Sequence, residues 1–233
     1  MLPTKKTPPT IQLNRQTMLI YGPSKIGKST FCSQMENALF LATEPGLTAL
    51  ETYNVPIKTW HELLNTAAEI LKMDHNFEFI IIDTIDNAYR MCTEYICEKH
   101  KIIHESDLAY GKGYALINNE FHRVINKLSL LPLGMVLISH SQEKDIETRT
   151  GKQTKIIPTL PEKASKMITG LVDLILYCDV ENDMDENDKS YWRRVLHTKP
   201  HPNFYAGDRT GKLPDILPLD FKEFSKYLTD KKE

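Results

Sequence analysis

MLIYGPSKIGKSTF, residues 18–31, begins as an apolar run and becomes a loop that holds two glycines, two lysines and two serines. This loop matches the pattern G-x-x-x-x-G-K-[ST], with Gly22, Gly27, Lys28 and Ser29 at the defining positions. The apolar run predicts a strand over 17–21, and the residues after the loop predict a helix that extends to Met35. Because the strand precedes the loop and the helix follows it, a phosphate-binding loop is favoured over an ordinary glycine-containing turn.

Each defining position of the loop has a physical reason to bind a nucleoside triphosphate. The glycines let backbone N–H groups face the phosphates, and the N-terminus of the helix adds positive potential. We expect Lys28 to bridge the β- and γ-phosphates, Ser29 to ligate Mg²⁺ and Thr30 to face the base. The sequence therefore predicts ATP and Mg²⁺ as ligands. The residues expected to bind the nucleotide are Gly22, Pro23, Ser24, Lys25, Ile26, Gly27, Lys28, Ser29 and Thr30.

A carboxylate ends each of two later apolar runs. Asp83 ends FEFIIID, where it can hold Mg²⁺ through water, so it joins Ser29 as a predicted metal-binding residue. The alternative for Asp83 is an aspartate that only ends a strand. Glu44 follows ALFLAT, and a carboxylate at a neighbouring strand end can orient the water that attacks the γ-phosphate. Many motor ATPases place such a glutamate directly after the metal-binding aspartate, whereas this chain has Thr84 there.

The rest of the chain alternates between helical and strand patterns. Residues 77–83 are apolar on both faces, which predicts a parallel sheet covered on two sides. We therefore predict an α/β fold: a mostly parallel twisted sheet with helices on both faces and antiparallel strands near the C-terminal end. Ligands of such sheets bind at the C-terminal ends of the strands. Residues 1–16 are predicted to form an N-terminal arm and 17–233 a single ATPase domain.

The composition excludes several classes of protein. The 233 residues carry a formal charge of −2, so contact with nucleic acid must come from local loops rather than from an overall basic field. Four cysteines are too few for a disulfide scaffold, and MLPTKKTPPT lacks the apolar core of a signal peptide. No membrane association is expected, and a cytoplasmic location follows, that of the host cell if a phage encodes the chain.

The phosphate loop followed by ALFLATE, FIIIDT and MVLISHSQ resembles the RecA-like P-loop ATPase core. YGKGY before a helix and RTGKLPDILPLDF near the C-terminus are similar to phage-encoded nucleotide-binding proteins, the Sak-type single-strand annealing and recombination ATPases. This resemblance covers roughly residues 17–221. Rossmann dehydrogenases and G proteins match less well, since the chain has neither G-x-G-x-x-G nor N-K-x-D.

The resemblance implies further catalytic residues. Glu44 would position the attacking water, while His140 and Gln142 would sense the γ-phosphate and pass its state to the following loop. The alternative for His140 is a histidine at a strand end that bonds to a backbone carbonyl.

The resemblance also implies a ring or filament of identical subunits, with the nucleotide at the subunit interface. A basic side chain of the neighbouring subunit would complete the site as an equivalent of an arginine finger. Lys199 is the candidate, although the family has a second lysine where this chain has His201. The competitors are Arg193, Arg194 and Arg209, and the alternative is a solvated strand face.

Single-stranded DNA is the partner that the resemblance implies, with a phage single-strand-binding protein as a further one. Two loops would face the DNA. The first interleaves aromatic and basic side chains, which could stack on bases and neutralise phosphates, although an ordinary loop before a helix explains it equally well. The second mixes cations with acids, so weak and salt-sensitive binding or an ordinary solvated hairpin is expected. The cations and aromatic residues are Tyr110, Lys112 and Tyr114 in the first loop, and Lys144, Arg149, Lys152 and Lys155 in the second.

Two patterns imitate metal sites. Cys97, His100 and His104 would share one face of a helix and could meet a zinc ion, but Cys92 would point elsewhere, and a buried apolar stripe explains this helix better. The acidic run 179–185 resembles a calcium loop without its glycine and its closing glutamate, so a solvated turn is favoured.

Together these observations predict an ATP-binding and ATP-hydrolysing RecA-like protein that acts on single-stranded DNA in phage recombination or annealing. Three alternatives remain. An AAA-type DNA-processing motor or helicase loader would need a glutamate directly after Asp83. A nucleotide-gated binding module would show negligible turnover. A small-molecule kinase would need an arginine-rich lid, whereas the second polar loop has only Arg149.

Overall fold

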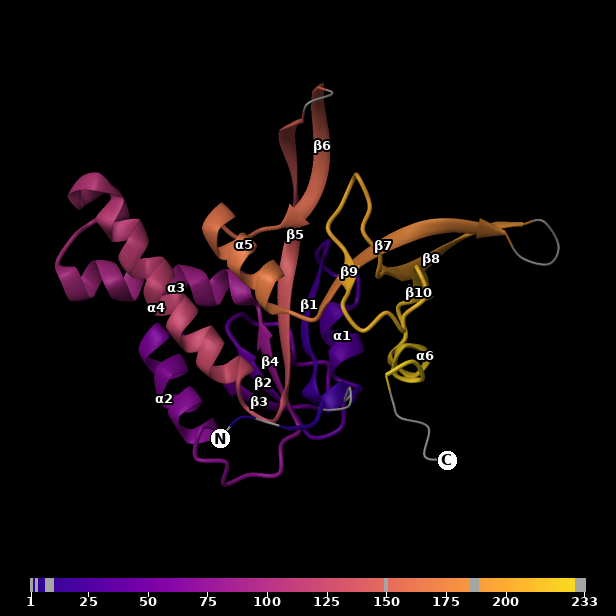
Figure 1. Ribbon diagram of the computed structural model, residues 1–233, viewed down its shortest axis with the longest axis horizontal. Coiled ribbons are helices and arrows are strands. Elements are labelled where there is room, and N and C mark those ends of the chain that lie inside the picture. The colour runs from indigo at the N-terminus through magenta and orange to yellow at the C-terminus, as the bar shows by residue number, and fades with distance from the viewer. Residues whose placement is uncertain (1, 3, 7–10, 149–150, 185–188, 229–233) are drawn as a thin grey trace.

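A largely parallel sheet runs through the middle of the molecule (Figure 1). The computed structural model describes every residue except 1, 3, 7–10, 149–150, 185–188 and 229–233. Neighbouring strands follow the order β10-β8-β7-β1-β5-β4-β2-β3, while β6 pairs with β5 and β9 with β7. The strands are β1 (Thr17–Gly22), β2 (Ala38–Ala42), β3 (Tyr53–Pro56), β4 (Phe79–Asp83), β5 (Gly134–Thr148), β6 (Gly151–Pro158), β7 (Leu174–Met184), β8 (Ser190–His197), β9 (Gly207–Asp208) and β10 (Ile216–Pro218).

Parallel pairing dominates the part of the sheet around β1. Five strand pairs are parallel: β7·β1, β1·β5, β5·β4, β4·β2 and β2·β3. Two strands from the C-terminal part of the chain are antiparallel to their neighbours, β8 to β7 and β10 to β8. The predicted α/β fold class, with its antiparallel strands near the C-terminus, is confirmed. β5 lies between β1 and β4, so the phosphate loop after β1 and Asp83 at the end of β4 sit one strand apart at the same edge of the sheet.

Helices cover both faces of this sheet. The helices are α1 (Lys28–Cys32), α2 (Trp60–Ile70), α3 (Ile85–His100), α4 (Lys112–Ser129), α5 (Glu162–Leu171) and α6 (Phe221–Ser225). The larger core lies under α2–α5, and a second core lies under α1 and α6. In β1, Leu19 joins the first core while Met18 and Ile20 join the second, because successive side chains of a strand point to opposite faces. Every residue of β1 is buried, as a two-sided sheet requires.

Two hairpins extend beyond the body of the molecule (Figure 1). β5 continues beyond its apolar segment, residues 134–138, to Thr148 because residues 141–148 pair antiparallel with β6. β7 likewise runs on to Met184, paired with β8. Arg149, at the end of the first hairpin, and Asp185, at the end of the second, lie outside the described residues.

Several predicted bounds need correction. α1 ends at Cys32, three residues earlier than predicted, and a turn in which Met35 N bonds to Cys32 O leads the chain into β2. β3 was not predicted, since its residues are mostly exposed and show no apolar period. Among the described residues, no helix combines the length and the apolar character that a membrane crossing needs.

Candidate nucleotide-binding site

The phosphate loop joins the C-terminal end of β1 to the first residue of α1. Its first glycine approaches β7 closely: a Cβ on Gly22 would lie 2.5 Å from the carbonyl oxygen of Cys178. Gly27 has φ of 113°, in the left-handed region that side chains disfavour. Both glycines of the motif therefore have a structural requirement in this chain, one for space and one for backbone conformation.

Lys28 folds back across the loop that precedes it. Its Nζ donates to the carbonyl oxygens of Gly22, at 2.9 Å, and of Pro23, at 2.8 Å. The residue is buried, and that burial lowers the pKa of the ammonium. The loop thus holds a cation at its centre, where phosphate oxygens would replace the missing solvation.

Ser29 and Asp83 meet at the mouth of the loop. Ser29 Oγ donates to Asp83 Oδ2 at 2.6 Å. Burial raises the pKa of Asp83, and the hydrogen bond from Ser29 opposes this effect. A hydroxyl and a carboxylate held together supply the hard oxygen ligands that Mg²⁺ prefers. The donor set therefore fits the ion that the loop motif implies, with Ser29 and Asp83 as the residues that would hold it.

Glu44 and His140 contribute to the same cavity. Glu44 Oε1 lies 3.3 Å from His140 Nε2, and His140 Nδ1 lies 3.2 Å from Ser24 Oγ. A cavity of about 600 Å³ is lined by these three side chains together with Lys28, Ser29, Thr30 and Asp83. The structure thus brings residues from the ends of β1, β2 and β4, and His140 from within β5, to one site.

A buried polar layer supports this cavity from behind. Asp86 accepts hydrogen bonds from Ser139 Oγ at 2.7 Å and from the backbone N–H of His140 at 2.8 Å. Burial raises the pKa of Asp86, and these two hydrogen bonds oppose it. Thr43 Oγ1 donates to the carbonyl oxygen of Thr84 and accepts from its N–H, which joins the ends of β2 and β4. Sequence reasoning missed Asp86 and Thr43, whose partners lie more than 40 residues away along the chain.

A family model described as an AAA domain, AAA_24, matches residues 14–210. The chain belongs to this AAA family. This membership supports the predicted P-loop ATPase core. The more specific assignment to Sak-type recombination ATPases is a proposal.

A curated relative and two solved structures are similar to this AAA domain. The SPbeta prophage-derived uncharacterized protein YorG of Bacillus subtilis (strain 168) is 25% identical over 216 residues, which cover 88% of this chain and 63% of the relative. The chain thus spans less than two thirds of that relative. A KaiC-like protein from Pyrococcus horikoshii OT3 aligns with 79% of this chain and 78% of its own at 12% identity and a TM-score of 0.45. Flagellar accessory protein FlaH from Methanocaldococcus jannaschii aligns with 80% and 78% at 10% identity and a TM-score of 0.41.

Two predicted catalytic residues of the AAA domain lie away from this cavity. Gln142 Nε2 donates to the carbonyl oxygen of Pro158 at 3.3 Å, and the side chain lines a groove between the β5–β6 hairpin and α5. Lys199 Nζ forms an ion pair with Asp208 Oδ2 at 3.1 Å. The structure therefore does not bring Gln142 or Lys199 to the phosphate loop of their own chain.

The competitors of Lys199 differ in their partners. Arg193 Nε pairs with Asp183 at 3.0 Å, and Arg209 pairs with Asp173 at 2.9 Å. Arg194 instead donates to the carbonyl oxygen of Ile26, inside the phosphate loop of the same chain. Ile26 is otherwise buried in the core under α1.

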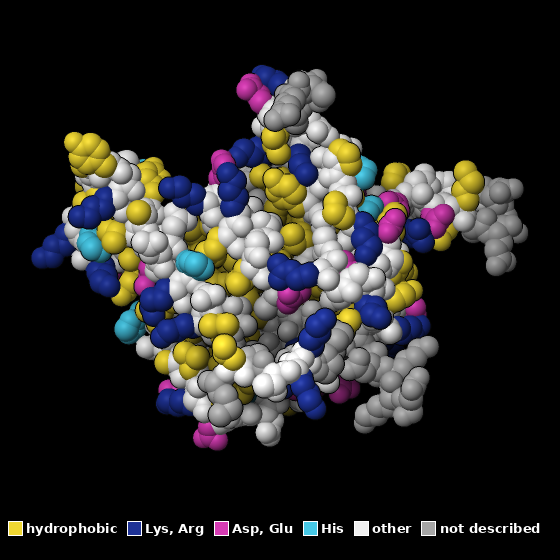
Figure 2. Space-filling view, in the orientation of Figure 1, with side chains coloured by type: hydrophobic (Ala, Val, Ile, Leu, Met, Phe, Trp, Pro, Cys, Tyr) yellow, Lys and Arg dark blue, Asp and Glu magenta, His cyan; other side chains and the backbone are white. Residues whose placement is uncertain are grey.

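The residues proposed to face DNA lie in two separate places. Tyr110 is fully exposed between α3 and α4, and Lys112 begins α4. In the β5–β6 hairpin, Lys144 pairs with Glu162 at 3.5 Å, and Lys155 Nζ lies 4.2 Å from the centre of the Tyr205 ring. Figure 2 shows Lys and Arg side chains spread over this face rather than gathered in one basic patch.

The two sequence patterns that imitate metal sites do not assemble one in the described part of the chain. No group of three His, Cys, Asp or Glu side chains among those residues is placed to hold a metal ion. His104 instead contacts Ser106 and Glu105, and Cys92 is buried against Ile117.

Proposed function

We propose that this AAA domain binds and hydrolyses ATP and couples turnover to single-stranded DNA in phage recombination or annealing. One observation carries the hydrolytic half: Glu44 lines the same cavity as Lys28 and the Ser29–Asp83 pair. The DNA half is supported by the sequence resemblance to Sak-type ATPases and by a relative described as prophage-derived.

We infer a task for five residues of the cavity, Lys28, Ser29, Asp83, Glu44 and His140. Backbone N–H groups of the loop and the Lys28 ammonium would hold the phosphates. Mg²⁺ held by Ser29 and Asp83 would neutralise charge on the phosphate oxygens. Glu44 would orient the attacking water and accept a hydrogen bond from it. His140, in contact with both Glu44 and Ser24, would fix the position of the Glu44 carboxylate.

Strand β5 would link hydrolysis to a surface hairpin. His140 stands in β5, and β5 continues without interruption into the hairpin that carries Lys144 and Lys155. A change in the hydrogen bonds of His140 when the γ-phosphate leaves would therefore act on a continuous strand. Gln142, two residues further along β5, would transmit that change by its contact with Pro158.

The proposal extends to assembly and location. In a ring or filament, Lys199 of a neighbouring subunit would supply the basic side chain that completes the site. The protein would work in the cytoplasm of the phage host, beside a phage single-strand-binding protein.

The test is steady-state phosphate release from ATP with and without single-stranded DNA across a salt series. Wild type should turn over faster with DNA, and the stimulation should fall as salt rises. Glu44→Gln should abolish turnover while ATP binding stays within about threefold. The matched control is Glu51→Gln, an exposed glutamate outside this cavity, which should behave as wild type. Zero wild-type turnover with DNA present would refute the hydrolytic half and favour a nucleotide-gated binding module.

Membership of an AAA family favours a second candidate, an AAA-type DNA-processing motor or helicase loader. Thr84 counts against this candidate, because it follows Asp83 directly, where such motors have a glutamate, and it is buried. ATP-dependent strand separation or helicase loading, rather than annealing, would identify this candidate.

A further inference from the structure

Arg194 reaches the phosphate loop from the side opposite to Glu44. Its Nη1 donates to the carbonyl oxygen of Ile26 at 3.2 Å, and it lies 2.8 Å from the place that a Cβ on Gly27 would occupy. β8, which carries Arg194, lies two strands from β1 on one side, whereas β2, which leads to Glu44, lies three strands away on the other. Arg194 and Glu44 therefore come from elements on different sides of β1.

The guanidinium of Arg194 is distinguished by its partner. Arg193, Arg209 and Lys199 each form an ion pair with an aspartate. Within the described residues, no carboxylate lies within ion-pair distance of Arg194, whose side chain contacts the neutral Ile26 carbonyl. The guanidinium therefore lies beside the loop that receives the phosphates without an ion-pair partner among the described residues.

The backbone of Arg194 is held firmly although its side chain is exposed. It is paired with Val180 of β7, and the next two residues of β8, Val195 and Leu196, are fully buried. The backbone N–H of Leu219 also bonds to the carbonyl oxygen of Arg194 at 3.0 Å. A side chain that extends from such a fixed position can restrain the loop it contacts.

We propose that Arg194 is a positioning residue for the nucleotide: it holds the phosphate loop of its own chain through the Ile26 carbonyl and adds positive potential to the phosphate site. This inference rests on the proposed nucleotide binding. It separates Arg194 from the role of a finger in the neighbouring subunit, because the contact is made within one chain. Hydrogen bonds from a charged donor are stronger than neutral ones, and the planar guanidinium fixes direction better than an ammonium.

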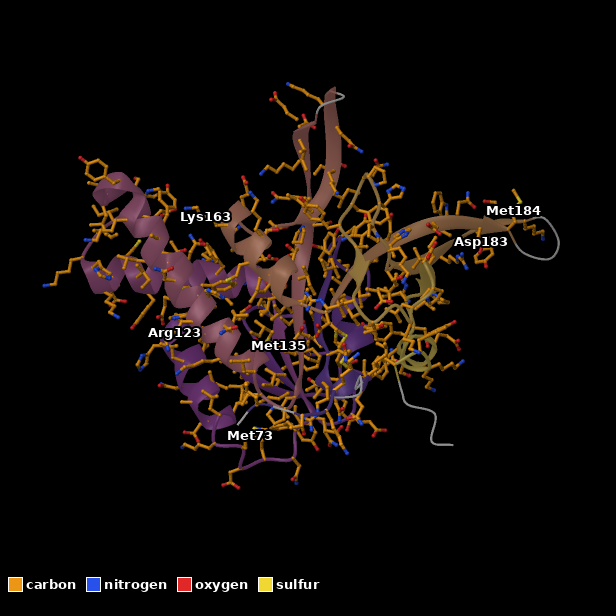
Figure 3. All side chains as sticks on the ribbon, in the orientation of Figure 1. Met73, Arg123, Met135, Lys163, Asp183 and Met184 are labelled. Atoms are coloured by element: carbon orange, nitrogen blue, oxygen red, sulfur yellow. The ribbon has the colours of Figure 1, made fainter. Side chains whose placement is uncertain are left out.

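Arg194 also connects the phosphate loop to the β7–β8 hairpin. Residues directly opposite one another in an antiparallel pair share a face, and alternate residues along each strand share it too. Arg194 therefore lies on the same face as Val180 and Trp192, which are both exposed. Asp183 and Met184 mark the far end of this hairpin, well away from the body of the molecule (Figure 3).

The experiment compares three variants of the full chain. Arg194→Ala removes the contact and the charge, and Arg194→Lys keeps the charge but not the planar guanidinium. Arg193→Ala is the matched control, since Arg193 precedes Arg194 in β8, faces the other side of that strand and pairs with Asp183 of β7. The dissociation constant for Mg·ATP is measured by titration calorimetry, KM and kcat by phosphate release, and the nucleotide-free melting temperature by scanning fluorimetry.

We expect Arg194→Ala to weaken Mg·ATP binding about 10-fold and to raise KM in proportion, with kcat within about threefold of wild type, as loss of uniform binding predicts. Arg194→Lys should recover part of the affinity, and Arg193→Ala should stay within about twofold. Equal affinities of wild type and Arg194→Ala, or equal losses in Arg193→Ala and Arg194→Ala, would overturn the inference while leaving the ATPase proposal intact. If wild type itself binds no Mg·ATP, both fail. Should Arg194→Ala melt far below wild type, Arg194→Gln, which keeps an N–H donor without the charge, replaces it; its Mg·ATP affinity should fall less than about 10-fold but more than that of Arg193→Ala, and an affinity equal to wild type would overturn the inference.

Discussion

Replacing Asp83 with asparagine should make the nucleotide-free protein more stable while removing its response to Mg²⁺. Asp83 is buried at the end of β4, and burial raises the pKa of its carboxyl group. Nearby Glu44 adds repulsion. The asparagine side chain would keep an oxygen that can accept the hydrogen bond from Ser29 Oγ. The substitution therefore removes the cost of a buried charge without leaving the Ser29 hydroxyl unpaired.

The sign and size of the effect follow from proton linkage. A carboxyl group whose pKa is raised in the folded state favours folding at low pH, and this contribution is lost as pH rises through the folded-state pKa. Each unit by which the pKa is raised corresponds to about 1.4 kcal/mol at high pH. In a chain of this size that free energy moves the melting temperature by about 3–6 °C. The difference between Asp83→Asn and wild type should therefore be largest near pH 8 and shrink toward pH 4.

Scanning fluorimetry from pH 4 to pH 8 in a chelating buffer gives the first readout. The second is the rise in melting temperature on adding ATP, with Mg²⁺ or with chelator: wild type should respond more strongly with Mg²⁺, whereas Asp83→Asn should respond equally in both. Asp74→Asn, at an exposed aspartate, controls for loss of a negative charge. A variant that melts below wild type at pH 8, or that keeps the full Mg²⁺ response, would refute this account of Asp83.

Three further substitutions test the surroundings of the cavity. Phe224→Ala removes a fully buried ring whose centre lies 5.4 Å from that of the Phe31 ring on α1. The free energy of unfolding, measured in urea, should fall by about 3–5 kcal/mol. A fall of less than about 1 kcal/mol would contradict the packing of α6. Gly27→Ala places a side chain at φ of 113° and against Arg194, so Mg·ATP affinity should fall at least about 10-fold by calorimetry, and unchanged affinity would show that the loop adapts. His140→Ala should lower kcat about 10-fold or more with KM within about twofold, because it frees Glu44; an equal rise in KM would instead assign His140 to phosphate binding.

The centre of the site could be predicted because its signals are local. The phosphate loop can be recognised from eight consecutive residues, and Glu44 and Asp83 each end an apolar run. In a parallel sheet, such ends meet at one edge, which is why two carboxylates far apart along the chain share a cavity with Lys28. The roles of these residues stay predictions until activity is measured.

The outer parts of the site depend on contacts that no local pattern encodes. Arg194 bonds to a carbonyl 168 residues earlier in the chain, and Asp86 to a backbone N–H 54 residues later. Gln142 follows His140 by two residues, but β5 continues past His140 and carries Gln142 into the β5–β6 hairpin. The residues of β6 show little alternation between polar and apolar side chains. A strand exposed on both faces lacks the apolar signal by which its length could be predicted.

The two ends of the central sheet have a practical consequence for handling the protein at high concentration. β3 and β10, which end the sheet, are four and three residues long. Short edge strands offer few free backbone groups to another molecule, and lysines such as Lys152 and Lys155 along β6 disfavour pairing of hairpins between molecules. Pairing of strands between molecules is thereby disfavoured, which favours solubility at high concentration.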